Sequence, residues 1–283
     1  TLRRQRQMCI RDSLKDMHES SALTLIRKLT NSSVNCSQLD VELLMMHVLK
    51  LKKNELYRDN PQINDQNKKD ILSLIKRRED GEPLAYVINE KGFRNLELYV
   101  DRNVLVPRPE TEIMVQTILD NFDSKPHNVI DLGTGSGAIG LSLSKERNNW
   151  DITCSDISIE ALKVAKKNMI SNSLKVNLVN GNWLESFQRD YFDIIVSNPP
   201  YLSPNDPSVH SDGLKHEPII ALVSESEGLK DIEKIINKSS KLLTRKGCLF
   251  IEHGNNQSKQ VCSLFKKYGF SEISTIEDLN GDN

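Results

Sequence analysis

The sequence lacks the features that mark several classes of protein. Its five cysteines are scattered without a C-x-x-C pair, and no His-Cys or H-E-x-x-H spacing is present, so no metal site is expected. No apolar run approaches the roughly 18 residues that a membrane-spanning helix needs, and no signal-peptide core is present. We therefore expect a cytoplasmic protein that holds no metal and contacts no membrane.

The chain also lacks an excess of charge of one sign. Lys and Arg together number 38, and Asp and Glu number 39. Enzymes that act on nucleic acids more often carry a basic excess, because they must neutralise phosphates. The balance favours a protein or small-molecule substrate over a direct nucleic-acid substrate, although a local basic patch stays compatible with it.

The most informative segment is residues 192–201, which read Phe-Asp-Ile-Ile-Val-Ser-Asn-Pro-Pro-Tyr. The apolar, β-branched part predicts a buried strand that stops at two prolines. Since proline has no N–H group, the following loop offers mostly carbonyl acceptors, and Asn198 adds another. Two such acceptors can hold a planar NH2 group, either an amide or an exocyclic base amine, and position its nitrogen for reaction. The alternative is an ordinary Pro-Pro turn after a strand.

A glycine-rich loop and an acid at a strand end form a second pattern. Residues 128–132 predict a buried strand, which Gly-Thr-Gly-Ser-Gly at 133–137 joins to a helix. This order is typical of a cradle for a nucleotide cofactor. The spacing G-x-G-x-G, with no P-loop Lys, disfavours dinucleotide and P-loop sites. Asp156 ends the next predicted strand, where its carboxylate could accept two ribose hydroxyls or, alternatively, cap a helix.

Taken together, the two patterns resemble the S-adenosylmethionine-dependent methyltransferases that modify amino groups. Residues 107–112, Pro-Arg-Pro-Glu-Thr-Glu, together with residues 217–218 and 252–257, narrow the resemblance to the HemK/PrmC family. These are the N5-glutamine methyltransferases of peptide chain release factors. The resemblance covers roughly residues 20–280.

The resemblance implies a function and a partner. The chain would transfer a methyl group from S-adenosylmethionine to the side-chain amide nitrogen of the glutamine in the GGQ motif of class-one release factors. Asn-Pro-Pro-Tyr alone is shared with DNA adenine methyltransferases, so an adenine or guanine amino methyltransferase is the alternative function. A third hypothesis is a module that binds the cofactor without turnover. We expect a monomer.

The resemblance also implies roles for individual residues. The cofactor-binding residues would be Gly133, Thr134, Gly135, Ser136, Gly137, Asp156, Asn182, Trp183 and Asn198. The substrate amide would be held by Asn198, Pro199, Pro200 and Tyr201, of which Asn198, Pro199 and Tyr201 are the expected catalytic residues. No acid–base residue is required, because methyl transfer cancels the charge of a sulfonium and the product can lose its proton to water.

Several residues keep two interpretations. At position 182 the family commonly has Asp; Asn182 can still accept from the adenine amine, but without charge. Trp183 would pack against the adenine ring or serve as a core aromatic residue. Asp131 could bind loop amides or the ammonium group of the cofactor. Arg108, together with Glu110 and Glu112, could contact the partner protein at the mouth of the site, or these residues could belong to a helix start.

The expected fold class is α/β, a Rossmann-like class I S-adenosylmethionine methyltransferase domain with a small N-terminal helical bundle and a β-hairpin linker. The expected divisions are a non-native tail at 1–16, a helical domain at 17–82, the hairpin linker at 83–106, and the methyltransferase domain at 107–283, with a truncated C-terminus. Alternating strand and helix patterns predict a parallel sheet with its ligands at the carboxyl ends of the strands.

The predicted elements of the methyltransferase domain follow from the same periodicity. Strands are expected near 128–132, 151–155, 175–179, 192–197, 248–252 and 272–277, and helices near 109–122, 137–146, 158–171, 227–244 and 256–268. Cys154 and Cys248 lie in apolar strand patterns, which predicts buried free thiols. In the helical domain, the pair Met45 and Met46 is expected to fill the core rather than to bind a cofactor.

Overall fold

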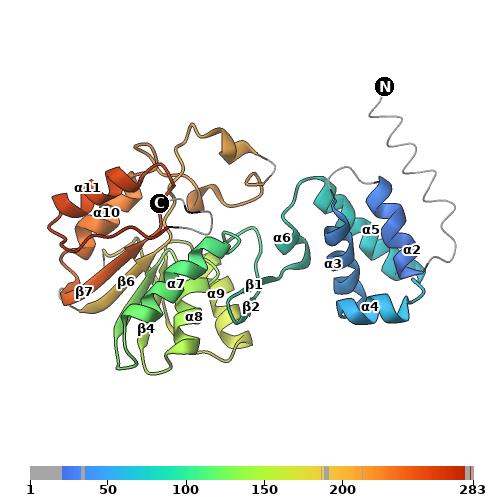
Figure 1. Cartoon of the computed structure of the whole chain (residues 1–283), viewed down its shortest axis with the longest axis horizontal. Helices are drawn as coiled ribbons and strands as arrows, with labels where there is room; N and C mark the ends of the chain where they lie inside the picture. Colours follow the sequence, from blue (N-terminus) through green and yellow to red (C-terminus); the bar gives the residue numbers. More distant parts are fainter. Residues whose placement is uncertain are drawn as a thin grey trace. The chain divides into compact units, whose positions relative to one another are not determined.

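The chain forms two compact units, Thr1–Ile88 and Asn89–Asn283, which are considered separately below (Figure 1). The computed structural model describes residues 21–32, 36–185, 187, 191–211, 213–277 and 281. The expected non-native tail at 1–16 lies outside the described residues. Within the described part of the chain, no helix combines the length and the apolar character that crossing a membrane requires.

In its described residues, the first unit consists of helices and one isolated bridge between Ser21 and Gln62. The helices are α2 (Ala22–Ser32), α3 (Gln38–Leu49), α4 (Lys53–Asp59), α5 (Asp65–Glu79) and α6 (Leu84–Ile88). Helix α3 begins with a reciprocal cap, because the Ser37 side chain accepts from the Asp40 N–H while the Asp40 carboxylate accepts from the Ser37 N–H. The fully buried side chains include Leu25, Leu44, Met45, Leu56 and Ile71. The prediction that Met45 and Met46 fill the core is confirmed for Met45, while Met46 is only partly buried and packs against the core.

The expected strand pairing at the start of the linker is wrong. Residues 84–88 form the short helix α6, whose first turn is closed by the Tyr86 and Val87 N–H groups donating to the Pro83 carbonyl. Both of these side chains are buried although they are neighbours in sequence, which a strand with one exposed face would not allow. The antiparallel hairpin follows as β1 (Lys91–Phe93) and β2 (Leu96–Leu98), within the second unit.

The second unit contains a parallel sheet. Its strands are β3 (Asn128–Leu132), β4 (Asp151–Asp156), β5 (Asn177–Asn180), β6 (Phe192–Ser197) and β7 (Leu243–Ile251). They lie in the order β5-β4-β3-β6-β7, and each neighbouring pair is parallel. The chain order reverses on either side of β3, and ligands of such sheets bind at the carboxyl ends beside this switch point.

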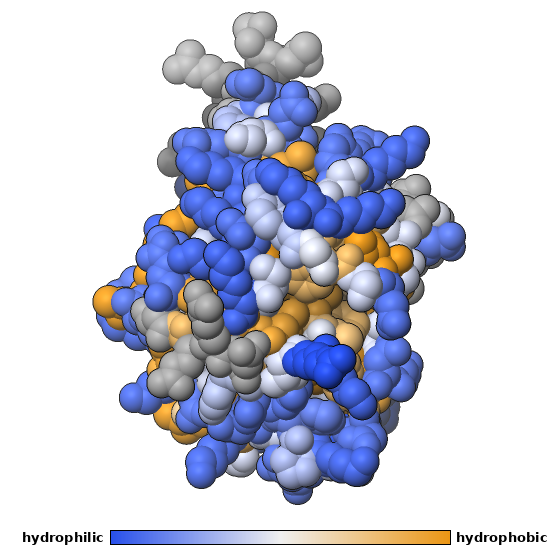
Figure 2. Space-filling view, turned by 90° about the vertical axis from the view of Figure 1, so that its left-hand side faces the viewer, coloured by the Kyte–Doolittle hydropathy of each residue, from blue (hydrophilic) through white to orange (hydrophobic). Residues whose placement is uncertain are grey.

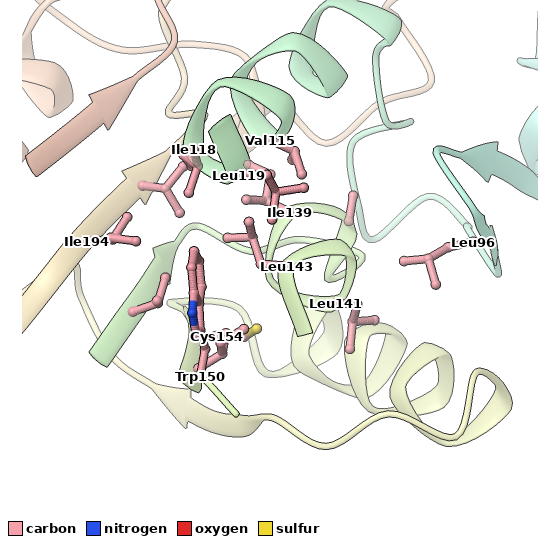
Figure 3. Close-up of a cluster of buried hydrophobic side chains, with 14 of the residues drawn as sticks. Leu96, Val115, Ile118, Leu119, Ile139, Leu141, Leu143, Trp150, Cys154 and Ile194 are labelled. Atoms are coloured by element: carbon pink, nitrogen blue, oxygen red, sulfur yellow. The ribbon is translucent and has the colours of Figure 1, made fainter. Parts of the chain in front are cut away.

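Helices cover both faces of the sheet (Figure 1). They are α7 (Pro109–Asn121), α8 (Ala138–Glu146), α9 (Ile159–Ser171), α10 (Lys230–Ser239) and α11 (Ser258–Lys267), with short 3-10 turns at Pro207–His210 and Ile219–Ala221. Successive strand residues face opposite cores. Ile194 packs with Ile118 of α7 and Leu143 of α8 (Figure 3). Val129 belongs to the same cluster, while Ile130 packs on the other face with α10. Because both faces are covered, the central strands β3 and β6 are buried at nearly every position.

Two expectations at the edge of this sheet are wrong. Cys248 is exposed, because β7 pairs only with β6 among the described strands and one side of it stays open. Cys154, on the internal strand β4, is buried as predicted. Residues 272–277 form no strand, since they make no ladder with β7 or with any other described strand.

Candidate functional site

The strand register brings the ends of four strands to one edge of the sheet. Leu132 of β3 pairs with Ser155 of β4 on one side and with Ser197 of β6 on the other. Ser197 in turn pairs with Ile251 of β7. The residues that directly follow these positions therefore lie around a common space at the carboxyl edge of the sheet.

The glycine loop after β3 adopts a backbone that only glycine enters readily. Gly133, Gly135 and Gly137 have φ angles of 68°, 55° and 86°, in the left-handed region. At Gly133 there is also little room, because an added Cβ would lie 3.2 Å from the Trp183 ring. The loop thus curls closely around the cavity, and main-chain N–H groups at the start of α8 can face a ligand there.

Asp131 accepts hydrogen bonds from this loop and from the start of α8 in the interior of the protein. Its Oδ2 accepts from the Thr134 hydroxyl at 2.6 Å and from the Gly140 N–H at 3.0 Å. The residue is fully buried, and burial raises the pKa of its carboxyl to about 6, against 3.8 for an ordinary aspartate. Asp131 does not line the cavity. Of its two interpretations, the geometry supports binding of the loop.

Asp156 lines the cavity at the end of β4. Its Oδ2 accepts from the Gly135 N–H and its Oδ1 from the Ser158 N–H, both at 2.9 Å. Helix α9 is capped by Ser158, whose side chain accepts from the Ala161 N–H at 3.2 Å. Each Asp156 oxygen keeps a lone pair for a ligand. Burial raises the pKa of Asp156, and the backbone hydrogen bonds partly offset that effect.

Asn182 and Trp183 form the wall next to Asp156. The Asn182 Nδ2 donates to Glu185 at 3.5 Å, which leaves its carbonyl oxygen as an acceptor. The Trp183 Nε1–H donates to Asp231 on α10 at 3.2 Å, so its ring is held at the edge of the glycine loop. Trp183 also contacts buried apolar residues of the sheet, so the ring belongs both to the cavity wall and to the core.

The Asn-Pro-Pro-Tyr segment divides between the cavity and the interior. Asn198 and Pro200 line the cavity. Pro199 is buried and is not one of the lining residues, and neither is Tyr201. Tyr201 packs against α10 and α11 next to Val261, and burial together with the charge of Glu252 raises the pKa of its hydroxyl to about 12. The expected catalytic roles of Pro199 and Tyr201 stay predictions.

Of the three charged residues in the Pro-Arg-Pro-Glu-Thr-Glu segment, one lies on the cavity wall. Arg108 lines the cavity and donates to the buried Glu217 at 2.5 Å. Glu112 instead accepts from the Arg94 N–H of the hairpin at 3.1 Å. Glu110 lies in the first turn of α7, where a carboxylate suits the positive end of the helix.

Sequence reasoning missed four residues of the site. Thr111 and Asp231 line the cavity, while Glu217 and Glu252 hold lining residues from behind. Glu217 and Glu252 contributed to the resemblance as motif members without a role. No local sequence pattern could assign a role to Glu217 or Glu252, because their hydrogen-bond partners are distant in sequence.

These elements enclose a cavity of about 340 Å³. Its wall combines the glycine loop, the acid Asp156, apolar residues such as Val104 and Ile157, and the Asn198 amide. This combination fits a nucleoside with a charged tail, since an acid and apolar groups suit a ribose and a base while main-chain N–H groups suit a carboxylate. Among the described residues, no cluster of His, Cys, Asp or Glu could hold a metal ion.

Comparison with known families gives two matches. The family described as PrmC N-terminal domain matches residues 22–88, which end where the first compact unit ends. The family described as Methyltransferase small domain matches residues 109–212, which include α7, the glycine loop and the Asn-Pro-Pro-Tyr segment.

Similar proteins cover nearly the whole chain. A release factor glutamine methyltransferase of Coxiella burnetii is 39% identical over 247 residues, covering 86% of this chain and 88% of that protein. Another, from Buchnera aphidicola subsp. Acyrthosiphon pisum, is 40% identical over 254 residues, covering 89% and 91%. Among solved structures, the hMettl16 catalytic domain in complex with a 3′UTR hairpin aligns with a TM-score of 0.50 at 18% identity, covering 78% of this chain and 81% of that one, which is a likeness of fold.

Proposed function

The chain belongs to the family of release factor glutamine methyltransferases, and from this premise we propose that it methylates the side-chain amide nitrogen of a glutamine in a peptide chain release factor. The methyl donor is S-adenosylmethionine, bound in the cavity at the carboxyl edge of the sheet. The GGQ motif of class-one release factors supplies the target glutamine. Cytoplasmic location and a monomeric state stay predictions.

The observation that carries this proposal is the Asn198 amide on the wall of the same cavity as Asp156 and the glycine loop. An amide nitrogen is a weak nucleophile, so the reaction depends on how it is held. The Asn198 carbonyl and the main-chain carbonyls of the proline loop can accept its two hydrogens, which directs its lone pair toward the methyl donor.

In the proposed complex, each cofactor-binding residue contacts a different part of S-adenosylmethionine. Asp156 accepts from the ribose hydroxyls, the Asn182 carbonyl accepts from the adenine amine, and the Trp183 ring packs beside the base. Thr134 and Ser136, with the three glycines of the loop, surround the methionine end. Bound S-adenosylmethionine supplies an electrophilic methyl group on a positively charged sulfur.

In the transfer itself, a bond forms between the glutamine nitrogen and the methyl carbon while the carbon–sulfur bond breaks. The electron pair stays on sulfur, whose positive charge is lost, and the nitrogen releases one proton to water. Because charge disappears from the site, no general base is needed. The protein contributes by binding and orienting the two reactants.

The direct test uses the purified chain, a release factor and tritiated S-adenosylmethionine. We expect label in the wild-type release factor and none in a release factor whose GGQ glutamine is replaced by alanine. Equal label in both substrates would overturn the assignment of the target residue. Label in DNA or ribosomal RNA, with none in protein, would instead establish the nucleic-acid activity.

The exposed apolar residues of the molecule indicate which form of the substrate this test should use. On the face drawn in Figure 2, hydrophobic residues lie in a recess bordered by hydrophilic ones. The large apolar side chains that stay exposed in the second unit include Ile219 and Ile220, and Ile220 also lines the cavity. A folded release factor can cover such groups where a free glutamine cannot, so the intact protein is the substrate to use.

A further inference from the structure

A chain of hydrogen bonds runs from the cavity wall into the protein behind Asn198. The Asn198 Nδ2 donates to the Thr111 Oγ1 at 3.1 Å, and the Thr111 hydroxyl donates to the Glu252 Oε2 at 2.8 Å. Asn198 follows β6, Thr111 lies in the first turn of α7, and Glu252 follows β7. Asn198 and Thr111 line the cavity, whereas Glu252 lies behind them.

The chemistry of the three groups sets the direction of this chain. An ionised carboxylate can only accept hydrogen bonds, so the single hydroxyl hydrogen of Thr111 is used for Glu252. The Thr111 oxygen then has only lone pairs left, and it must face the NH2 side of the Asn198 amide. The carbonyl oxygen of Asn198 consequently points away from Thr111 and is free to accept from another group.

The hydrogen bonds that reach Glu252 agree with this direction, since Thr111 and Asn198 both act as donors on this side. Burial is the largest effect and raises the pKa of its carboxyl above the ordinary value, although hydrogen bonds from Thr111 and Asn198 partly offset that effect. Glu110 also raises the pKa, while the positive charge of Arg108 lowers it. The Asn198 amide is therefore flanked on its NH2 side by two acceptors, the hydroxyl oxygen and the carboxylate.

We propose that Thr111 and Glu252 are positioning residues for methyl transfer, which hold the Asn198 amide with its NH2 group inward and its carbonyl oxygen toward the target nitrogen. The identity of that target rests on the function proposed above. An amide has nearly the same shape after a half-turn, so packing alone would select its orientation weakly. A turned amide would present NH2 to the substrate NH2, and two donors facing each other cannot bond.

The first test compares Thr111→Val with Thr111→Ser in the labelling assay. Valine keeps the shape of threonine without the hydroxyl, so we expect kcat to fall by about tenfold, as the loss of one orienting hydrogen bond implies. Affinity for S-adenosylmethionine should stay close to wild type. Tm should fall, because the buried Glu252 loses a donor, and Thr111→Ser should recover most of both kcat and Tm. Thr117→Val, the same change further along α7 and outside the cavity wall, is the matched control.

A double-mutant cycle asks whether Thr111 acts through Asn198. In an Asn198→Ala background, Thr111→Val should lower the remaining kcat by less than about twofold, because the group that it orients is gone. A tenfold loss in that background as well would overturn the proposal and assign Thr111 an independent role.

An activity-independent readout comes from NMR of the asparagine side chains in the ¹⁵N-labelled protein, with the Asn198 NH2 signal identified by its loss in Asn198→Ala. In Thr111→Val this signal should shift and exchange faster with solvent, and in Thr111→Ser it should return. Glu252→Gln should shift it too, and Thr117→Val should not. An unchanged signal in Thr111→Val would overturn the positioning role. If the NMR result holds but wild type labels no release factor, the proposed substrate fails and the positioning role stands.

Discussion

The Arg108 guanidinium and the Glu217 carboxylate meet at 2.5 Å although they are 109 residues apart in sequence. The Glu217 side chain is only 1% exposed, and its second oxygen accepts from the Val106 N–H at 3.0 Å. One buried carboxylate thus holds the segment that leads into α7 at two points. This contact places the start of α7, and with it Thr111, against the cavity.

We expect Glu217→Ala to destabilise the protein by about 2 to 3 kcal/mol, because it leaves a buried N–H group and a partly buried guanidinium without their acceptor. Urea unfolding measures the change. Glu225→Ala, which removes the exposed partner of Lys230, is the control and should leave the free energy of unfolding close to that of wild type. Similar decreases in the free energy of unfolding of the two variants would show that the buried contact stabilises the protein no more than the exposed one.

Asn198→Ala should lower kcat by about 30- to 1,000-fold, equivalent to about 2 to 4 kcal/mol, since it removes an acceptor at the reacting nitrogen. Affinity for S-adenosylmethionine, measured by calorimetry, should stay within a few-fold of wild type. Asn121→Ala, at the far end of α7, should change neither quantity. A loss of cofactor affinity as large as the loss of rate would assign Asn198 to the cofactor instead.

Asp156→Ala should act mainly on cofactor affinity. Each hydrogen bond to a charged acceptor is worth about 1.5 to 3 kcal/mol, so losing one or both ribose contacts should weaken S-adenosylmethionine binding by at least about tenfold. Ser158→Ala removes the cap of α9 and should lower stability by about 1 kcal/mol without this loss of affinity. Unchanged affinity in Asp156→Ala would leave that residue a purely structural role in the loop.

The buried Asp131 predicts a specific pH dependence of stability. Its pKa is about 6 in the folded protein and near 3.8 when unfolded, so the folded state holds the proton more tightly. The free energy of unfolding should therefore be greatest, as far as this residue is concerned, below about pH 4. It should fall by up to about 3 kcal/mol as the pH rises to 6 and above.

Unfolding in urea between pH 4 and pH 8 tests this prediction by comparing wild type with Asp131→Asn. The difference in free energy between the two proteins should change by up to about 3 kcal/mol across the range, in favour of the variant at high pH. Asp120→Asn, an exposed site on α7, should keep the wild-type pH dependence. A constant difference between wild type and Asp131→Asn would contradict the shifted pKa.

The sequence by itself determined the parts of this protein that depend on local chemistry. The apolar runs predicted β3 and β6, because strands buried on both faces need apolar residues at most of their positions. The spacing of three glycines predicted the loop at 133–137, since that loop needs a backbone that other residues avoid. The same sequence patterns predicted that Asp156 ends one strand and that Asn198 directly follows another.

The tertiary structure alone determined the interactions that join segments distant in sequence. It also determined the places where burial overrides a local sequence pattern. The sequence favoured a hairpin over residues 83–106, but Tyr86 and Val87 are both buried and residues 84–88 form the helix α6. Cys248 has the neighbours of a buried residue, yet β7 lies at an edge. Thr111 is separated from Asn198 by 87 residues and from Glu252 by 141. Periodicity reports which face of an element is buried and never which residue another element brings to it, so this network became visible only once the sheet had assembled.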